Sequence, residues 1–355
     1  MVAVSEGLLD AVAGFLVERD GADADSAGLV AAVSDAGVDA GAGAEGVAQA
    51  LITLGIRARD GRDLPRAERL FALAGEVAAD AEDAPLWVRA RTLLGGLHRI
   101  QGRYGEGEEV LRGALAVADG EPGMPLGPLV GVCNQLGILF KYSGKFVEAE
   151  VFYRRALLLL EEGDLGEDPA AASLFHNLSG LAHSRGDFAA AVEPGRRAIA
   201  VRERALGPDH LEVALDKAAL APVLIELDEL EEAEALLTSA LAVVEETYGP
   251  EHYETGIAVG NLAALAYRRG QYARAQELFR RCLRLKERAL GPAHPELAVT
   301  LNNLAILARR NGDPDGAGSL WGRALAVLHA SVQPGHPLLA AVRRGLDSLA
   351  PDVPA

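Results

Sequence analysis

Aromatic residues, methionine and cysteine are scarce in this sequence, and it contains no long apolar run. Aromatic side chains make up 5% of its 355 residues, although 50% of the chain is hydrophobic. No stretch reaches the ~20 apolar residues that a membrane-spanning helix needs. The N-terminus also has no basic region ahead of an apolar core, as a secretion signal would. These absences predict a cytoplasmic protein whose helices pack through small aliphatic side chains.

Basic residues are outnumbered by acidic ones. The chain has 34 Lys and Arg against 51 Asp and Glu, which gives a formal net charge of -17. Nucleic acids and anionic membranes are both held by basic patches. The charge balance therefore predicts no nucleic-acid partner and no membrane partner.

One feature is present at a constant interval of 42 residues along the second half of the chain. It is a histidine that follows a proline by two residues, at His210, His252, His294 and His336. A constant period of this length predicts stacked copies of one small unit. Histidines on successive copies lie a helix diameter apart, ~10 Å, so they cannot converge on one metal ion. We expect them to cap the starts of helices.

Each copy has the pattern of a helix hairpin. In the last full copy, Leu297, Leu301 and Leu304 recur at the spacing of one helical face. Gly312 then ends the helix, and apolar residues resume at helical spacing from Ala317 onward. The same turn position recurs in six copies, at Gly102, Gly144, Gly186, Asp228, Gly270 and Gly312. A further copy with an offset of 40 residues precedes them, so the sequence contains seven.

These residues resemble a known family. A Leu-Ala or Leu-Gly pair, a turn glycine with an aromatic residue two positions later, and alanines around a large residue form the tetratricopeptide pattern. The Leu-Gly-Pro-x-His segments and Leu301-Asn302-Asn303-Leu304-Ala305 look like the kinesin-light-chain type of 42-residue repeat. The resemblance covers residues ~44 to 349. It implies an all-α fold, a right-handed superhelical solenoid of about seven hairpins.

The ends of the chain fall outside the period. Residues 1–43 contain two amphipathic stretches and are expected to form an N-terminal helical cap. Residues 44–336 form the expected array, and residues 337–355 a capping helix and tail. Cys133 and Cys282 occupy positions where other copies carry apolar or small residues, so we expect buried, reduced thiols.

Polar residues on the first helix of each copy are the candidates for binding, because those helices line the inner wall of such a solenoid. Amides and one histidine form two rows just before the leucine that lies eight residues ahead of each turn position. One row contains Asn134, His176 and Asn302, and the next contains Gln135, Asn177, Asn261 and Asn303. Carboxamides both donate and accept hydrogen bonds, so such rows can pair with the backbone of an extended peptide. They can equally bond neighbouring helices or face water.

Basic and aromatic residues lie one or two turns further along the same helices: Lys141, Tyr142, His183, Tyr267, Arg268, Arg309 and Arg310. They could receive acidic side chains or a C-terminal carboxylate. Alternatively they are ordinary helix ends, where basic groups suit the helix dipole.

The fifth copy departs from the pattern. Lys217 replaces a large apolar residue, alanines replace the amides, Pro222 lies inside the first helix, and Asp228 replaces the turn glycine. Proline inside a helix removes a backbone hydrogen bond, so a kink is expected. An alternative to simple drift is a polar pocket at this kink, formed by four residues: His176, His183, Asp216 and Lys217.

The leading functional hypothesis is a scaffold that binds a peptide segment or a partner protein in the groove of the array. The alternative is a small-molecule-binding or enzymatic protein of a specialised biosynthetic pathway, with the pocket near the fifth copy. We predict no catalytic residue, no metal and no cofactor, because no motif for them appears with supporting context. Self-association through the ends of the array stays open.

Overall fold

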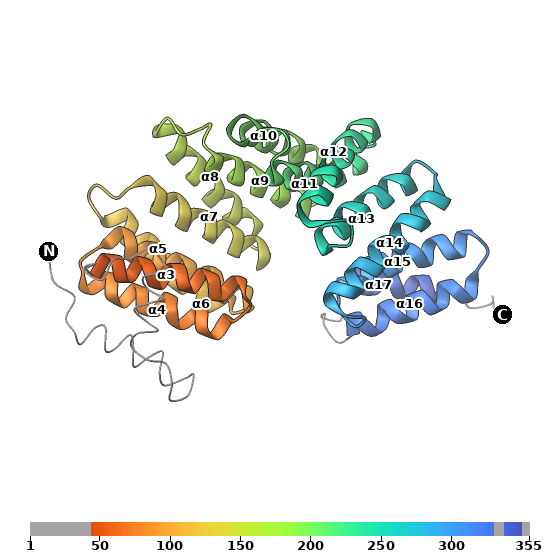
Figure 1. Cartoon of the computed structure of the whole chain (residues 1–355), viewed down its shortest axis with the longest axis horizontal. Coiled ribbons are helices and arrows are strands. Elements are labelled where there is room, and N and C mark those ends of the chain that lie inside the picture. Colours follow the sequence, from red (N-terminus) through yellow and green to blue (C-terminus); the bar gives the residue numbers. More distant parts are fainter. Residues whose placement is uncertain (1–43, 330–336, 350–355) are drawn as a thin grey trace. The chain divides into compact units, whose positions relative to one another are not determined.

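The structure is a computed structural model that describes residues 44–329 and 337–349, and every helix in these ranges is an α-helix (Figure 1). The chain divides into two compact units, Met1–Glu167 and Asp168–Ala355, which we describe separately. The expected cap over residues 1–43 lies outside the described residues.

The first unit contains three helix hairpins. Their helices are α3 (Ala44–Asp60) with α4 (Leu64–Asp80), α5 (Ala84–Ile100) with α6 (Tyr104–Gly120), and α7 (Leu126–Tyr142) with α8 (Phe146–Glu162). Within this unit, the first helices of successive hairpins contact one another, α3 with α5 and α5 with α7.

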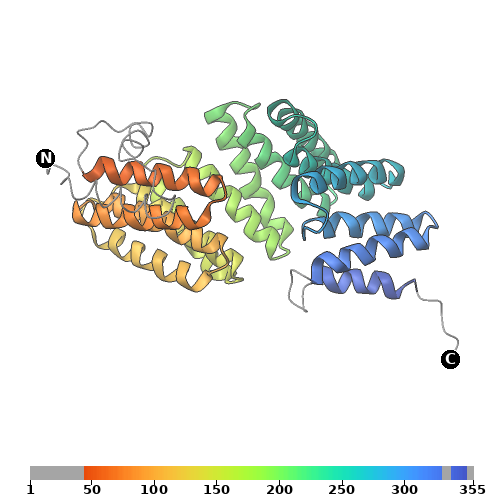
Figure 2. The same cartoon turned by 60° about the horizontal axis from the view of Figure 1, so that its bottom comes forward.

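The second unit contains four hairpins and a final helix. Its helices are α9 (Pro169–Ser184) with α10 (Phe188–Leu206), α11 (Leu211–Glu226) with α12 (Leu230–Tyr248), α13 (Tyr253–Arg268) with α14 (Tyr272–Leu290), α15 (Leu297–Arg310) with α16 (Pro314–His329), and α17 (Pro337–Asp347). The helices of each hairpin run side by side in both views (Figure 1 and Figure 2). The all-α fold and the seven predicted hairpins are confirmed, and α17 packs on α15 and α16 at the C-terminal end.

The turn inside each hairpin needs a left-handed backbone. The five turn glycines have φ between 74° and 79°, and Asp228 takes the same conformation at 63°. Arg62, which holds this position in the first hairpin, has φ 64°. Aspartate tolerates this conformation better than most residues, because its short side chain can hydrogen-bond locally. The fifth hairpin therefore keeps its turn without glycine.

A small residue lets the two helices of a hairpin approach closely. In the third hairpin, a Cβ placed on Gly137 would lie 2.4 Å from the ring of Tyr153, a residue with no exposed surface. Gly55 faces Phe71 and Gly95 faces Leu111 in the same way in the first two hairpins. In the second unit this position is held by other small residues, all of them buried: Ser179, Ala221, Ala263 and Ala305. Each hairpin is thus built on one small residue against the opposite helix.

Ion pairs join the second helices of successive hairpins. Arg281 on α14 lies 2.7 Å from Glu245 on α12, and Arg323 on α16 lies 2.5 Å from Glu287 on α14. In the first unit, Arg155 on α8 pairs with Asp119 on α6. All three pairs span 36 residues. The same ion pair, between an acidic residue of one copy and an arginine of the next, therefore recurs along the array.

Two of the repeated histidines cap helices, as predicted: His210 is the N-cap of α11 and His252 is the N-cap of α13. His210 Nδ1 accepts a hydrogen bond from the Glu212 backbone N–H at 3.2 Å, and His252 does the same for Glu254. His294 Nδ1 accepts a hydrogen bond from the Glu296 N–H at 3.3 Å, but it does not cap α15, because that helix begins at Leu297 and has Glu296 as its N-cap. His336 lies outside the described residues.

Both cysteines are buried free thiols, which confirms that prediction. Burial raises the pKa of the Cys133 thiol to about 11, and it also raises the pKa of Cys282. Within the described residues, every helix is too short or too polar to cross a membrane.

The close approach at Gly137 can be tested on one helix. Replacing Gly137 with Ala should lower stability by ~1–3 kcal/mol, because the added methyl group overlaps the Tyr153 ring. Gly131→Ala is the matched control, since a Cβ at Gly131 on the same helix meets nothing within 4 Å. That control should be stabilising by ~0.5–1 kcal/mol. Thermal unfolding followed by circular dichroism measures both, and equal shifts of the two midpoints would contradict the packing account.

Candidate functional site

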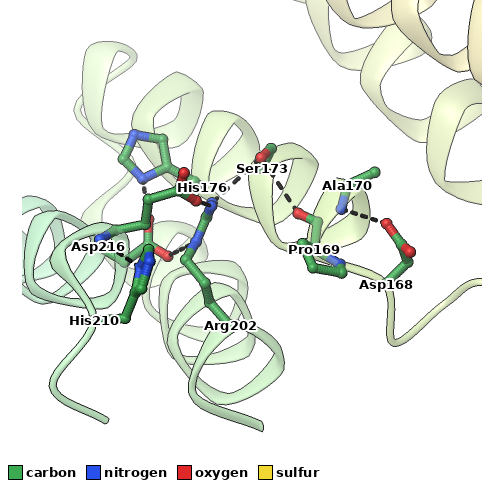
Figure 3. Close-up of polar contacts among 9 residues, drawn as sticks. Asp168, Pro169, Ala170, Ser173, His176, Arg202, His210 and Asp216 are labelled. Carbon is green, nitrogen blue, oxygen red and sulfur yellow. Dashed lines mark hydrogen bonds and ion pairs between the residues drawn. The ribbon is translucent and has the colours of Figure 1, made fainter. Parts of the chain in front are cut away.

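The second unit holds a cluster of charged side chains between α9, α10 and α11 (Figure 3). At its centre is Asp216, which is 4% exposed. Its Oδ1 lies 2.7 Å from Nδ1 of His176, and its Oδ2 accepts a hydrogen bond from Nε of Arg202 at 2.7 Å. A buried carboxylate is costly unless it is paired, and here two basic side chains from two other helices pair with it.

Arg202 ties this cluster to the starts of α9 and α11. Its guanidinium donates to Glu212 on α11 and to Ser173 Oγ on α9, the latter at 3.3 Å (Figure 3). Arg202 is 7% exposed, whereas the side chain of His176 is 40% exposed. The fixed ion pair therefore lies inside, and the imidazole that it orients reaches the surface.

Sequence reasoning missed Arg202, although a signal for it exists. The equivalent positions in most other copies are buried and apolar, namely Ala118, Leu160, Val244 and Leu328, and only the copy with Lys286 also has a basic residue there. Asp216 likewise occupies a buried position that Leu174 holds in the preceding copy. Two opposite charges in two apolar rows of adjacent helices indicate a buried ion pair.

Only part of the predicted alternative pocket comes together. His176 and Asp216 are in contact, but His183 packs edge-on against Phe188, with ring centroids 5.6 Å apart. Lys217 points to a different carboxylate, Glu203 on α10, at 2.8 Å. The four residues therefore belong to three separate contacts, and within the described residues no group of three potential ligands could hold a metal ion.

Lys217 takes over a link that its copy has lost. In other copies an arginine on the second helix pairs with an acidic residue on the second helix of the preceding hairpin. In the fifth copy Ser239 replaces that arginine, and the acidic residue of the preceding hairpin is Glu203. Lys217 Nζ reaches Glu203 and also donates to Ser239 Oγ at 3.4 Å. Its side chain starts in an apolar row, and its ammonium group binds the carboxylate that lacks an arginine partner in this copy, which accounts for the buried lysine.

Asn261 has a structural contact that explains Pro222. Proline has no N–H, so Pro222 leaves the Ala218 carbonyl of α11 without its usual hydrogen bond. Asn261 Nδ2, on the next hairpin, donates to that carbonyl oxygen at 3.1 Å. The helix α11 continues through Pro222 from Leu211 to Glu226. One amide of the predicted binding rows is thus engaged within the protein.

The other predicted amides differ in their surroundings. Asn302 Oδ1 accepts a hydrogen bond from Trp321 Nε1 at 2.9 Å. In the first unit, Gln135 Oε1 is buried and has no hydrogen-bond partner among the residues that the structure describes. Asn303 is half-buried and lies one turn after the exposed Val299 on the same face of α15. Asn134 on α7 and Asn177 on α9 are also half-buried. The members of these rows therefore differ: Asn261 and Asn302 are bonded within the protein, and Asn303 is partly exposed.

The predicted basic and aromatic positions lie at the C-terminal ends of these helices. In the first unit, Tyr142 is 61% exposed and carries the Arg99 guanidinium 5.0 Å from its ring centre. Lys141 beside it is half-buried, and burial lowers the pKa of its ammonium group.

In the second unit, several of these positions already have contacts. Arg268 lies 3.5 Å from Asp228, and Arg309 donates to Ser348 Oγ at 2.6 Å. Tyr267 packs edge-on against Tyr272, whose ring lies 3.8 Å from the Arg310 guanidinium. The alternative of ordinary helix ends therefore fits these residues better than a ready-made anion site.

The link between Asn261 and Pro222 predicts a coupling between two substitutions. Asn261→Ala should cost ~1–3 kcal/mol, because the Ala218 carbonyl loses the side-chain donor that Asn261 supplies. In a Pro222→Ala background the same substitution should cost less, since residue 222 regains an N–H for that carbonyl. Thermal unfolding of the four proteins of this double-mutant cycle measures the coupling, and additive effects would contradict the account.

The replacement of an arginine by Lys217 predicts a second coupling. Ser239→Arg should stabilise the protein by up to ~1 kcal/mol in a Lys217→Leu background, where Glu203 is free to pair. In the natural sequence Ser239→Arg should give no gain, because two cations would compete for one carboxylate. A gain of equal size in both backgrounds, measured as the unfolding midpoint, would rule out the replacement.

Comparison with known proteins identifies the repeats. A family model described as tetratricopeptide repeat matches residues 212–288 and 255–328, and a second model of the same description matches residues 171–212. No curated protein in the comparison matches significantly.

Two of the solved structures compared below, those with a TM-score above 0.5, share the fold at low identity. A tetratricopeptide repeat protein from Parabacteroides merdae aligns at 16% identity with a TM-score of 0.53, over 85% of this chain and 98% of that one. The apo form of the quorum sensor NprR from B. thuringiensis aligns at 14% identity with a TM-score of 0.56, over 82% and 79%. A putative kinesin light chain from Podosopora anserina aligns at 22% identity with a TM-score of 0.46, over 57% and 96%.

The matched residues lie in the second unit, and the hairpin, the turn conformation and the small-residue contact recur in the first. Residues 171–328 of this chain are tetratricopeptide repeats, as the sequence resemblance predicted.

Proposed function

We propose that this chain is a scaffold that binds a peptide segment or a partner protein on the first helices of its hairpins. Repeat arrays of this kind present extended surfaces for binding. The observation that supports the proposal is the occurrence, on these helices, of the partly exposed amide Asn303 together with exposed apolar or aromatic residues such as Val299 and Tyr142.

The buried ion pair does not support an enzymatic alternative. Asp216 makes contacts with His176 and Arg202 through both of its carboxylate oxygens, so it is occupied in holding three helices together. His176 remains available at the surface beside the amide row. We therefore assign the cluster a structural task and keep His176 as a candidate contact for the bound segment. The cytoplasmic location stays a prediction.

Site-specific photocrosslinking tests this function. A benzophenone amino acid placed at Asn303 in the second unit, or at Tyr142 in the first, should form covalent adducts with polypeptides in cells of the source organism. The control is Glu277, which is exposed on α14, a second helix. Adducts at positions 303 and 142 but not at 277 are expected. Equal adduct yields at all three positions, or none at 303 and 142, would rule out the proposed surface.

A further inference from the structure

One face of the second unit combines exposure to solvent with a complete lack of charge. It consists of four positions on each of three helices, α11, α13 and α15. The residues are Leu215, Ala218, Ala219 and Pro222 on α11, Ile257, Gly260, Asn261 and Ala264 on α13, and Val299, Asn302, Asn303 and Ile306 on α15. None of these positions is buried, and none carries Asp, Glu, Lys or Arg. We call this surface the uncharged face. Since 24% of the residues of the chain are charged, a solvent-accessible strip with no charged residue departs from the average composition.

The uncharged face is largely apolar. Leu215 is 39% exposed and Val299 is 53% exposed, and Ile257 lies between them in the repeat with partial exposure. Seven residues further along the same helices follow Pro222, Ala264 and Ile306, all partly exposed. Exposed apolar side chains that continue across neighbouring helices mark interaction surfaces, whereas isolated ones need no explanation.

Charges border this face but do not enter it. Before the apolar row, Glu212 and Glu254 lie in the first turns of α11 and α13, and Glu296 immediately precedes α15. At the far ends of α13 and α15 lie Arg268 and Arg310. The absence of charge is therefore confined to the strip between these borders.

This distribution indicates which chemistry the strip accepts. A charged side chain laid on the strip would lose hydration without gaining an opposite charge, which is costly. An apolar side chain would instead bury apolar surface on both partners, worth ~25 cal/mol per Å². The partly exposed carboxamide of Asn303 lies within the strip and can bond a peptide backbone.

The repeat also indicates the spacing of the bound side chains. α11 packs against α13, and packed helices lie ~8–10 Å apart. An extended chain in the polyproline-II conformation advances ~3.1 Å per residue and has three residues per turn, so side chains three residues apart lie on the same side and match the spacing of successive helices. A helical ligand would have its backbone groups already satisfied and could not use the carboxamide in this way.

We propose that the uncharged face binds an extended peptide segment with uncharged, apolar side chains at every third position. This inference rests on the proposed binding function and specifies the chemistry of the partner. It differs from the acidic ligand that the basic helix ends suggested.

Fluorescence polarisation with two synthetic peptide pools tests the inference on the full chain. Both pools hold labelled nine-residue peptides with Ser, Thr, Asn or Gly at the variable positions. One pool has Leu at positions 1, 4 and 7, and the other has Glu there. The Leu pool should bind at least about tenfold more tightly than the Glu pool. Val299→Glu should weaken binding of the Leu pool by about tenfold or more, because it places a charge in the strip.

Val151→Glu provides the matched control, since Val151 is also an exposed valine, 58% exposed, but lies on α8 in the first unit. It should leave binding unchanged, and circular dichroism should show both variants folded. Equal binding of the two pools, or equal effects of the two variants, would overturn the inference. So would tighter binding of an alanine-based helical peptide with Leu at positions 1, 8 and 15. If polypeptides still crosslink at position 303 while the Leu pool fails, only the ligand chemistry is wrong and the scaffold function stands.

Discussion

The close approach of two helices at one small residue is the constraint on which each hairpin depends. Where Gly137 meets Tyr153, a single methyl group would overlap the ring, so the large residue of one helix fills the space that the small residue of the other leaves. Because this contact recurs in every copy, the first helices all turn the same residues toward solvent. The candidate binding rows follow from this constraint.

The fifth hairpin shows how the array tolerates departures from its pattern. Pro222 removes a backbone donor, and Asn261 supplies another from the next hairpin. Ser239 removes a cation, and Lys217 supplies one from the facing helix. Asp216 introduces a buried charge, and Arg202 neutralises it. Each loss is compensated by a polar group of a neighbouring element, so this copy keeps its helices and its turn. The compensation also links the hairpins α9/α10, α11/α12 and α13/α14 to one another.

The fold could be predicted from the sequence because hairpin formation depends on periodic residues. The turn positions, the histidine caps of α11 and α13, and the seven copies all follow from spacing, and the structure agrees with them. The partners of the irregular residues could not be predicted in the same way. Spacing places Asn261 in a row of amides, but it does not reveal that the Ala218 carbonyl on another helix needs a donor. Nor does the period mark the division of the chain after Glu167. His176 and Asp216 were placed together correctly, whereas Lys217 and His183 belong to other contacts.

Hydrogen–deuterium exchange of the backbone amides in α11 tests the central claim most directly, namely that polar partners restore what the fifth copy lacks. If Asn261, Lys217 and Arg202 act as described, amides on both sides of Pro222 should be protected to the same degree as those of α13, the first helix of a regular copy. The Asn261→Ala variant should lose protection around residues 218–225 first. Rapid exchange of α11 in the natural protein, with α13 protected, would contradict the account.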